Sequence, residues 1–352
     1  MQSMSSDWQV VAMPLGKWSC TRCGLAYRDP ALPHPADFES GYALYAHAPG
    51  GSAEHQRQSE YAAWIAEAAG SATRVLDVGC GNGSLLVALQ QLWPASTLMG
   101  CDLSPDAVRC AQAAGLDVWT GSLADRSLGS CADLVMSVNV IEHTADPHAF
   151  VAALAGAVSD AGKVVLICPD GRRAGVELLI ADHLFSFDAH HLEALCAAAA
   201  LTPVHWCRAP RRLGAFQMLV ASRDGVPSSV PARDPDELLV ARRKYLAAWQ
   251  QLEASMKSRL PPEIVCFGAG EAAGLLRAYA PGVWARVTSC ATDADVAGTF
   301  GDRPVVSLDD VPADAAVLVG VRPQDQPVVA ERLRQRFRNV VTWYDFVPAD
   351  DA

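Results

Sequence analysis

An apolar strand that leads directly into a glycine turn limits the possible folds of this chain more than any other feature. Residues 75–84 read VLDVGCGNGS, and an apolar helical segment, Leu85 to Leu92, follows them. Gly79, Gly81 and Gly83 let backbone N–H groups approach a ligand closely at the start of this helix. The pattern predicts a doubly wound, mostly parallel α/β sheet whose ligand site lies at the carboxyl end of this strand.

The acid just ahead of the first glycine narrows the class of ligand. The glycines alone would also suit a dinucleotide, but Asp77 would repel a pyrophosphate at this turn. The cationic amino group of a methionine moiety would instead be attracted to this carboxylate. The order GxGxG, in place of GxGxxG, favours the same interpretation.

The next two strands supply groups for the rest of the same ligand. The strand from Leu98 to Asp102 ends in an acid about 20 residues past the glycine turn, where a carboxylate can hold both hydroxyls of a ribose. A third strand, Val118 to Leu123, brings Ser122 and the backbone of Leu123 near an adenine edge. We therefore expect a nucleoside to be bound by Asp102, Leu103, Ser122 and Leu123.

A fourth strand, Asp133 to His143, ends in Glu142 and His143. Here the chain strongly resembles the class I S-adenosylmethionine-dependent methyltransferases. Their glycine loop looks like LDVGCGNG, their ribose acid looks like Asp102, and their EH-then-DP signature looks like IEHTADP at residues 141–147. The resemblance covers about residues 75–222 and implies S-adenosyl-L-methionine as the cofactor. Asn139, on the same strand, joins the cofactor-binding candidates.

Methyl transfer needs a nucleophile held about 3 Å from the methyl group and a base that removes its proton. The unperturbed pKa of a histidine side chain suits a general base, so His143 is the candidate base, and Glu142 could fix its tautomer or act itself. His183 follows the fifth strand, Lys163 to Cys168, and matches the histidine of the family's DH…F pattern. A packing or helix-capping role is the alternative for His183. Tyr45, with Tyr42, matches tyrosines that the family brings over the cofactor.

The first 50 residues form a separate N-terminal segment. Cys20 and Cys23 lie in CTRCGL, which is typical of a zinc knuckle and resembles the N-terminal module of sugar C-methyltransferases. Those proteins supply a second CxxC upstream, which this chain lacks. Two thiolates do not complete a tetrahedral site, even with His34 as a third ligand. Zinc at this pair is therefore possible, and a knuckle without metal is favoured.

Three further segments complete the predicted organisation. Residues 51–225 form the cofactor domain, and its late strand from Phe216 to Ala221 belongs to an antiparallel pair. Residues 226–262 contain a Pro/Ser-rich linker and a bridging helix with an apolar stripe of Leu239, Leu246, Trp249, Leu252 and Met256. Residues 263–352 form a second, smaller Rossmann-like α/β domain. Its glycine turn at Gly268 and Gly270 loosely resembles the C-terminal domain of the same sugar methyltransferases.

Charge and composition exclude some partners. The chain carries 28 Lys and Arg against 39 Asp and Glu, a formal net charge of −11. An acidic chain without basic runs is a poor candidate for binding nucleic acid. No run of about 18 apolar residues and no basic-then-apolar leader occurs, so we expect no membrane partner and a cytoplasmic location. The eleven scattered cysteines fit reduced, mostly buried thiols.

These patterns predict S-adenosylmethionine-dependent methylation, at carbon or oxygen, of a small polar acceptor. The resemblance in the flanking segments favours a nucleotide-linked or phosphorylated sugar, and the chain is expected to be a monomer or a homodimer. Two alternatives stay open. One is a nicotinamide-dependent oxidoreductase that uses the glycine turn at Gly268, and the other is a non-catalytic, cofactor-binding subunit. The C-terminal turn would bind the nucleotide or phosphate part of a substrate, or serve only structure or dimerisation.

Overall fold

The protein is described here by a computed structural model that covers residues 2–32, 49, 52–126, 129–230, 234–293 and 298–347. These residues form two compact units, and each is described by itself. The larger unit contains residues 18–172 and 182–234, and the smaller unit contains residues 2–17, 173–181 and 235–347. The four segments expected from the sequence stay a prediction about domain organisation.

Within its described residues, the larger unit is built on a seven-stranded sheet in the order β11-β12-β9-β8-β5-β6-β7. Strands β9, β8, β5, β6 and β7 run parallel, and β12 is antiparallel to both β9 and β11. The strands are β5 (Arg74–Val78), β6 (Thr97–Asp102), β7 (Asp117–Thr120), β8 (Ala132–Val138), β9 (Val158–Pro169), β11 (Thr202–Arg208) and β12 (Phe216–Ser222). The prediction of a doubly wound, mostly parallel sheet is confirmed, and its strand order reverses between β5 and β8, where such sheets bind ligands.

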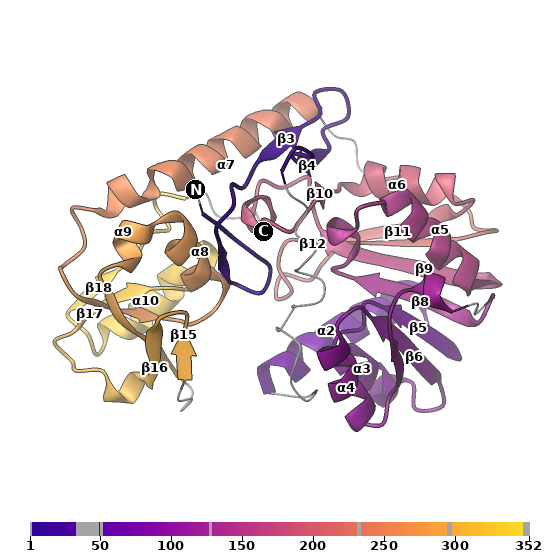
Figure 1. Cartoon of the computed structure of the whole chain (residues 1–352), viewed down its shortest axis with the longest axis horizontal. Helices are drawn as coiled ribbons and strands as arrows, with labels where there is room; N and C mark the ends of the chain where they lie inside the picture. The colour runs from indigo at the N-terminus through magenta and orange to yellow at the C-terminus, as the bar shows by residue number, and fades with distance from the viewer. Residues whose placement is uncertain are drawn as a thin grey trace. The chain divides into compact units, whose positions relative to one another are not determined.

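Helices cover both faces of this sheet (Figure 1). Helices α2 (Ser52–Ala69), α3 (Ser84–Leu92) and α4 (Pro105–Ala113) bury an apolar cluster that includes Tyr61, Leu89 and Val108. Helices α5 (Pro147–Ala157) and α6 (Ala189–Ala198) bury a second cluster with Leu154 and Leu195. Because both faces are covered, the central strands are almost continuously apolar.

Two predicted strands end earlier than the sequence suggested. Strand β7 stops at Thr120, and Leu123 begins a short 3-10 helix, η1 (Leu123–Asp125). Strand β8 stops at Val138, because Asn139 adopts a left-handed backbone conformation with φ of 56°. Glu142 therefore lies on a second 3-10 helix, η2 (Ile141–His143), which leaves the sheet.

A small three-stranded sheet in the order β10-β4-β3 joins the CxxC segment to the larger unit. It contains β3 (Lys17–Ser19), β4 (Ala26–Arg28) and β10 (Phe185–Ser186). Strands β4 and β10 are antiparallel, with Tyr27 opposite Phe185. Residues far apart in the sequence thus share one hydrogen-bonded ladder.

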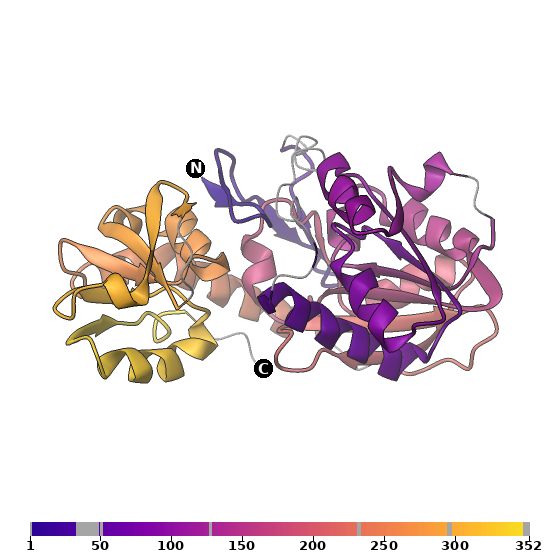
Figure 2. The same ribbon diagram turned by 90° about the horizontal axis from the view of Figure 1, so that it is seen from below.

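The smaller unit contains a six-stranded sheet among its described residues, in the order β15-β16-β14-β13-β17-β18. Its strands are parallel except for β15. They are β13 (Ile264–Phe267), β14 (Val287–Thr292), β15 (Gly298–Phe300), β16 (Arg303–Ser307), β17 (Ala316–Val319) and β18 (Asn339–Val341). Helix α10 (Gln326–Arg334), yellow in Figure 2, packs Ala330 and Leu333 on one face. The prediction of a second α/β fold is confirmed.

The smaller unit also contains a short N-terminal hairpin, β1 (Ser3–Met4) and β2 (Val10–Val11), which the sequence did not reveal. The hairpin packs on α8 (Glu271–Tyr279) at Gly274, where a Cβ atom would lie 2.8 Å from the sulfur of Met4. The short helices of the smaller unit, among its described residues, are α9 (Pro281–Trp284), η3 (Val176–Leu179), η4 (Leu308–Asp310) and η5 (Pro323–Asp325).

Helix α7 (Pro235–Met256) corresponds to the predicted bridging helix, with a different apolar face. Leu239 and Leu246 are only partly buried, so the predicted stripe was wrong at these two positions. Leu238 and Tyr245 are buried in their place, one position earlier in each turn. Within the described residues, no helix combines the length and apolar character that crossing a bilayer requires.

The turn after β5 leaves no room for a side chain at Gly79 or Gly83. At Gly83, φ is +79° and a Cβ atom would lie 2.2 Å from Cδ1 of Leu116; at Gly79, with φ of +83°, it would lie 2.2 Å from Cγ2 of Val140. Gly70 has the same φ of +79° as Gly83 but no atom within 4 Å of the added Cβ. Alanine variants at these two glycines therefore separate the cost of backbone strain, which both share, from the cost of a steric clash, which arises only at Gly83.

We expect Gly83→Ala to destabilise the protein more than Gly70→Ala. The left-handed backbone costs each variant about 1–2 kcal/mol, and Gly83→Ala must also displace Leu116. Urea denaturation of both variants without ligand measures the difference. Equal losses of unfolding free energy would show that the turn can relax around a side chain.

Candidate functional site

Asp77 lies at the carboxyl end of β5 and its side chain is buried, with 2% of its surface exposed. Its Oδ1 has no hydrogen-bond partner among the described residues. Burial, together with the charge of Asp102, raises the pKa of Asp77 to about 8. A buried carboxyl group without a partner is costly, and a ligand that brings a cation or a donor to it would remove that cost.

Asp102 is the last residue of the neighbouring strand β6, and its carboxylate is hydrogen-bonded to the glycine turn. One carboxylate oxygen accepts the N–H of Gly81 at 2.8 Å, and the other accepts the N–H of Ser104 at 2.8 Å. Burial raises the pKa of Asp102, and these two hydrogen bonds oppose the rise. Leu103, the next residue, is 47% exposed and offers an apolar surface beside the acid.

Ser122 and Leu123 lie where β7 passes into η1. The Ser122 hydroxyl donates to Oδ2 of Asp125 at 2.9 Å, and its backbone N–H donates to the same oxygen at 2.7 Å. Both donors of Ser122 are thus engaged within the turn. Leu123 is partly buried and begins η1.

Asn139 provides a second buried acceptor near the turn. Its N–H donates to the carbonyl of Ile167 at 2.8 Å, which holds the left-handed residue in place. Its side-chain Oδ1 is buried and has no hydrogen-bond partner within the described residues. Asn139 directly follows β8, which pairs with β5, so two unsatisfied acceptors, on Asp77 and Asn139, lie at the carboxyl ends of adjacent strands. Such a pair suits a ligand with several N–H donors.

Helix α2 adds a residue that the sequence did not single out. Nδ2 of Asn82, in the glycine turn, donates to Oε1 of Glu54 at 3.2 Å, and Oδ1 of Asn82 accepts the N–H of Ser84. Glu54 thereby ties the first turn of α2 to the glycine turn. The sequence signal for this contact was Glu54 itself, an acid in the first turn of the helix that precedes β5.

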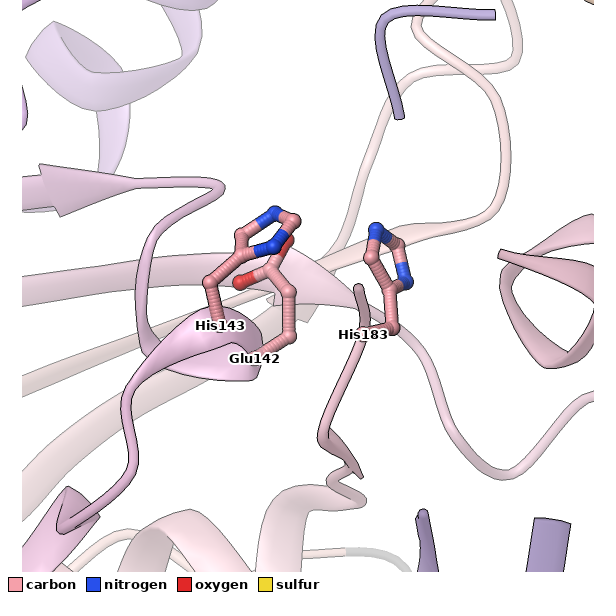
Figure 3. Close-up of side chains that lie close together, drawn as sticks. All are labelled: Glu142, His143 and His183. Carbon is pink, nitrogen blue, oxygen red and sulfur yellow. The ribbon is translucent and has the colours of Figure 1, made fainter. Parts of the chain in front are cut away.

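The candidate catalytic residues come together at the end of β8 (Figure 3). Glu142 and His143 project from η2, and His183 faces them from a separate segment. One polar atom from each of the three residues lies within 4.8 Å of the others, and the two histidine rings are edge to face with centroids 4.8 Å apart. Glu142 and His183 are buried, and the carbonyl of Glu142 accepts the N–H of Leu184 at 2.7 Å.

His143 is oriented by Asp182, which the sequence analysis did not assign. Nδ1 of His143 lies 3.0 Å from the carbonyl oxygen of Asp182 and 3.5 Å from its Oδ2. A proton on Nδ1 donates toward these oxygens and leaves Nε2 as the proton acceptor. The side chain of Asp182 is itself buried. This arrangement fits a histidine that serves as a general base with one fixed tautomer.

The CxxC pair forms a tight turn. The N–H of Cys20 donates to the carbonyl of Leu25 at 2.8 Å, and the N–H of Gly24 donates to the carbonyl of Cys20 at 2.9 Å. Hydrogen bonds from the backbone of Cys23 and Arg22 lower the pKa of Cys20. Across the described part of the chain, this pair belongs to no group of three potential metal ligands. Zinc at this turn stays a prediction, and His34, Tyr42 and Tyr45 lie outside the described residues.

His191 fastens the CxxC turn to α6. Its Nε2 lies 3.0 Å from the carbonyl oxygen of Cys23, and its Nδ1 accepts the N–H of Asp188 at 3.1 Å. The proton on Nε2 therefore donates to the turn. This contact joins residues 168 positions apart, so local patterns could not reveal it.

The two glycines of the predicted turn in the smaller unit differ in their surroundings. Gly268, with φ of +116°, passes so close to Gly320 that a Cβ atom would lie 2.6 Å from the Gly320 carbonyl oxygen, whereas a Cβ atom on Gly270 would meet no atom within 4 Å. Asp293, the acid after β14, binds Nη1 of Arg332 at 2.9 Å. Close packing therefore requires a glycine at position 268, and whether this turn binds a nucleotide or phosphate group stays a prediction.

Known proteins resemble the larger unit in sequence. Residues 53–205 match the model of a family described as a methyltransferase domain. A malonyl-[acyl-carrier protein] O-methyltransferase from Herminiimonas arsenicoxydans is 42% identical over 72 residues, which are 20% of this chain and 28% of that protein. A trans-aconitate 2-methyltransferase from Rhodococcus jostii is 35% identical over 24% of this chain and 34% of that protein.

A ubiquinone biosynthesis O-methyltransferase from Bordetella avium is 36% identical over 29% of this chain and 45% of that protein. The chain thus spans less than half the length of each of these relatives. Magnesium protoporphyrin IX methyltransferase from Synechocystis, solved with bound S-adenosylmethionine, is 19% identical, with a TM-score of 0.41 over 56% of this chain and 100% of that chain.

The raised pKa of Asp77 predicts a pH-dependent stability for the ligand-free protein. The ordinary pKa is 3.8, so folding takes up a proton between about pH 4 and pH 8, and stability falls as the pH rises through this range. Asp77→Asn removes the titrating group. We expect the variant to exceed the parent in unfolding free energy by more at pH 9 than at pH 4.5, with a difference between the two pH values of roughly 1 kcal/mol or more.

Urea denaturation at the two pH values measures this difference. Asp133→Asn is the matched control, because a hydrogen bond with Arg74 holds the pKa of Asp133 below its ordinary value. The unfolding free energy of Asp133→Asn should not exceed that of the parent protein at pH 9. If Asp77→Asn does not raise the unfolding free energy, or raises it equally at both pH values, the buried, unpaired state of this carboxyl would be contradicted.

Proposed function

We propose that this protein is an S-adenosyl-L-methionine-dependent methyltransferase. The observation that carries the proposal is the buried carboxyl of Asp77, which lies at the carboxyl end of β5 ahead of a glycine turn and whose Oδ1 has no partner among the described residues. The match of residues 53–205 to a methyltransferase domain supports it independently. Bound S-adenosylmethionine supplies an electrophilic methyl group on a sulfonium.

The residues at the carboxyl ends of the strands fit the parts of this cofactor. Asp77 would receive its ammonium group, and the unsatisfied Oδ1 of Asn139 would accept a second donor from it. Asp102, held by two backbone N–H groups, keeps lone pairs for the ribose hydroxyls. The exposed side chain of Leu103 and the Ser122–Leu123 turn would border the adenine.

Proton removal is assigned to His143. Asp182 fixes the Nδ1 side of the ring, so Nε2 takes the proton from an acceptor hydroxyl or from a carbon beside a ketone. Glu142 and His183 lie next to the ring and would hold or pass on this proton. Cys20 and Cys23 are not needed for this chemistry.

The acceptor is proposed to be a small polar molecule, with a nucleotide-linked or phosphorylated sugar favoured. The names of the relatives refer to malonyl-[acyl-carrier protein], trans-aconitate and ubiquinone biosynthesis, so they differ in acceptor. The sugar proposal rests on the resemblance of residues 1–50 and 263–352 to segments of sugar C-methyltransferases.

We expect His143→Ala to keep cofactor binding and to lower turnover by about two to four powers of ten, because it removes only the proton acceptor. Calorimetric titration with S-adenosylmethionine and a methyl-transfer assay measure the two effects. His148→Ala, an exposed histidine on α5, is the control and should change neither quantity. Unchanged turnover in His143→Ala would remove His143 from the role of base.

Asp77→Ala should abolish cofactor binding in the same titration. Repeating the titration of the parent protein with a panel of nucleotide sugars tests the acceptor. Cofactor binding that strengthens with one nucleotide sugar would support the acceptor class. Cofactor binding that responds to none of them would contradict the sugar proposal and leave the methyltransferase proposal standing.

A further inference from the structure

We propose that Glu142, His143 and His183 form a binding site for one divalent transition-metal ion of the Zn²⁺ or Co²⁺ class. Neither the sequence motifs nor the family match assigns a metal to these residues. The inference rests on the proposed function in one respect, because the ion would bind the nitrogen that is proposed to take the proton. The metal-bound protein would then be an inactive form of the enzyme.

The three side chains supply the donor atoms that such an ion prefers. Two imidazole nitrogens and one carboxylate oxygen are the protein ligands of many zinc sites, and the same set holds other first-row divalent ions. One ligand atom from each residue lies within 4.8 Å of the other two, and no other three potential ligands form such a group among the residues that the structure describes. Two ligands of one zinc ion are at most about 4.2 Å apart, which is twice the Zn–N distance. An ion would therefore draw the side chains together by roughly half an ångström.

His143 is already held as a metal ligand usually is. Metal-binding histidines commonly donate their second N–H to a carboxylate or a backbone carbonyl, which fixes the tautomer and the orientation of the ring. Nδ1 of His143 lies 3.0 Å from the carbonyl oxygen of Asp182 and 3.5 Å from its Oδ2. A proton on Nδ1 leaves Nε2 as the nitrogen that carries the lone pair for an ion. This contact is independent of the proximity of the three side chains and favours the same use of them.

The backbone fixes the two segments that carry the ligands (Figure 3). The N–H of Leu184, the residue after His183, donates to the carbonyl of Glu142 at 2.7 Å, and the N–H of His143 donates to the carbonyl of Val140 at 2.9 Å. Segments that are far apart in the sequence are thus joined directly beside the ligands. Ligands held on a fixed backbone lose little freedom when an ion binds, so less of the binding free energy is spent on ordering them.

Burial and charge also favour a cation at this position. Glu142 and Asp182 have only 2% and 5% of their surface exposed, and His183 is buried as well. Little water screens the charges of such groups, so a carboxylate here attracts a divalent cation more strongly than an exposed carboxylate does. Glu142 would ligate the ion directly, whereas Asp182 would act on it through His143.

An ion at this site would stop the proposed proton transfer. It would occupy the lone pair on Nε2 of His143, to which the proposed function assigns the proton of the acceptor. Asp77 and Asp102 are not among the three ligands, so the metal-bound protein should still bind the cofactor. We therefore expect the ion to inhibit turnover and a chelator to restore it.

Titration of the full-length, chelator-treated protein with Co²⁺ tests the site, because the visible d–d absorption of cobalt reports its coordination. We expect His183→Ala and Glu142→Gln each to weaken Co²⁺ binding roughly tenfold or more, since each removes a ligand. His190→Ala is the matched control and should bind as the parent does. His190 lies 3.5 Å from Glu193, in a histidine–carboxylate pair that belongs to no group of three potential ligands within the described residues.

The double variant Cys20→Ser, Cys23→Ser excludes the CxxC turn as the source of the signal. A cobalt ion at that pair would show thiolate-to-metal charge-transfer bands, which the three proposed ligands do not produce. Weak d–d absorption that is kept in this variant and in His190→Ala, and is lost in His183→Ala and Glu142→Gln, would support the inference.

A parent protein that binds no Co²⁺ would overturn the inference, as would binding that is unchanged in a folded His183→Ala variant or lost only with the two cysteines. Circular dichroism checks the fold of each variant. If His183→Ala does not fold, Glu142→Gln decides, because glutamine keeps the shape of the side chain and removes its charge.

A methyl-transfer assay separates this inference from the proposed function. Ion binding that needs His183, in a parent protein without methyl transfer, would support the site and count against the proposed function alone. Ion binding that needs His183 and leaves turnover unchanged would support the site and count against His143 as the base. Methyl transfer by a parent protein that binds no ion would overturn the inference and leave the proposed function standing.

Discussion

The burial of an acid at the end of β5 is the constraint on which the site in the larger unit depends. Asp77 has no hydrogen-bond partner for Oδ1 among the described residues, and a second acid, Asp102, follows the adjacent strand. Both carboxyl groups have raised pKa values because they are withdrawn from water. The N–H groups of Gly81 and Ser104 stabilise the carboxylate of Asp102. Asp77 is therefore the carboxyl group that an external cation would stabilise most.

The glycine turn makes this arrangement possible. A side chain at Gly79 or Gly83 would collide with Val140 or Leu116, so the backbone can pass under these residues only without a Cβ atom. The N–H of Gly81 is then free to reach Asp102 at the next strand end. The same corner thus holds Asp102 in place and starts α3, while Oδ1 of Asp77 receives no hydrogen bond from the described residues.

Local patterns predicted the parts of the fold that local physics determines. Apolar segments that end in glycines or acids predicted the parallel strands β5 to β9 and the two α/β folds. The end of β8 was predicted too late, because the left-handed backbone of Asn139 is not visible in composition. Among site residues, Asp77 and Asp102 stand at strand ends and could be found. Asp182 and His191 act through contacts between distant segments, so no spacing in the sequence indicated them.

The two halves of the proposed reaction are assigned to different residues of the larger unit. Asp77 and Asp102 belong to the proposed cofactor half, whereas Asp182 and His143 belong to the proposed proton-transfer half. Each half contains a buried carboxyl group. Oδ1 of Asp77 has no hydrogen-bond partner among the described residues, and Oδ2 of Asp182 lies 3.5 Å from Nδ1 of His143.

Proton release on cofactor binding tests the central claim most directly. With a pKa of about 8, Asp77 is mostly protonated at pH 7 in the ligand-free protein, and pairing with an ammonium group must ionise it. Calorimetric titration with S-adenosylmethionine in buffers of different ionisation enthalpy should therefore report close to one proton released per cofactor at pH 7, where the carboxyl group is mostly protonated and the amino group of the cofactor is mostly charged. Tight binding with no proton release at pH 7, or no binding at all, would contradict the account.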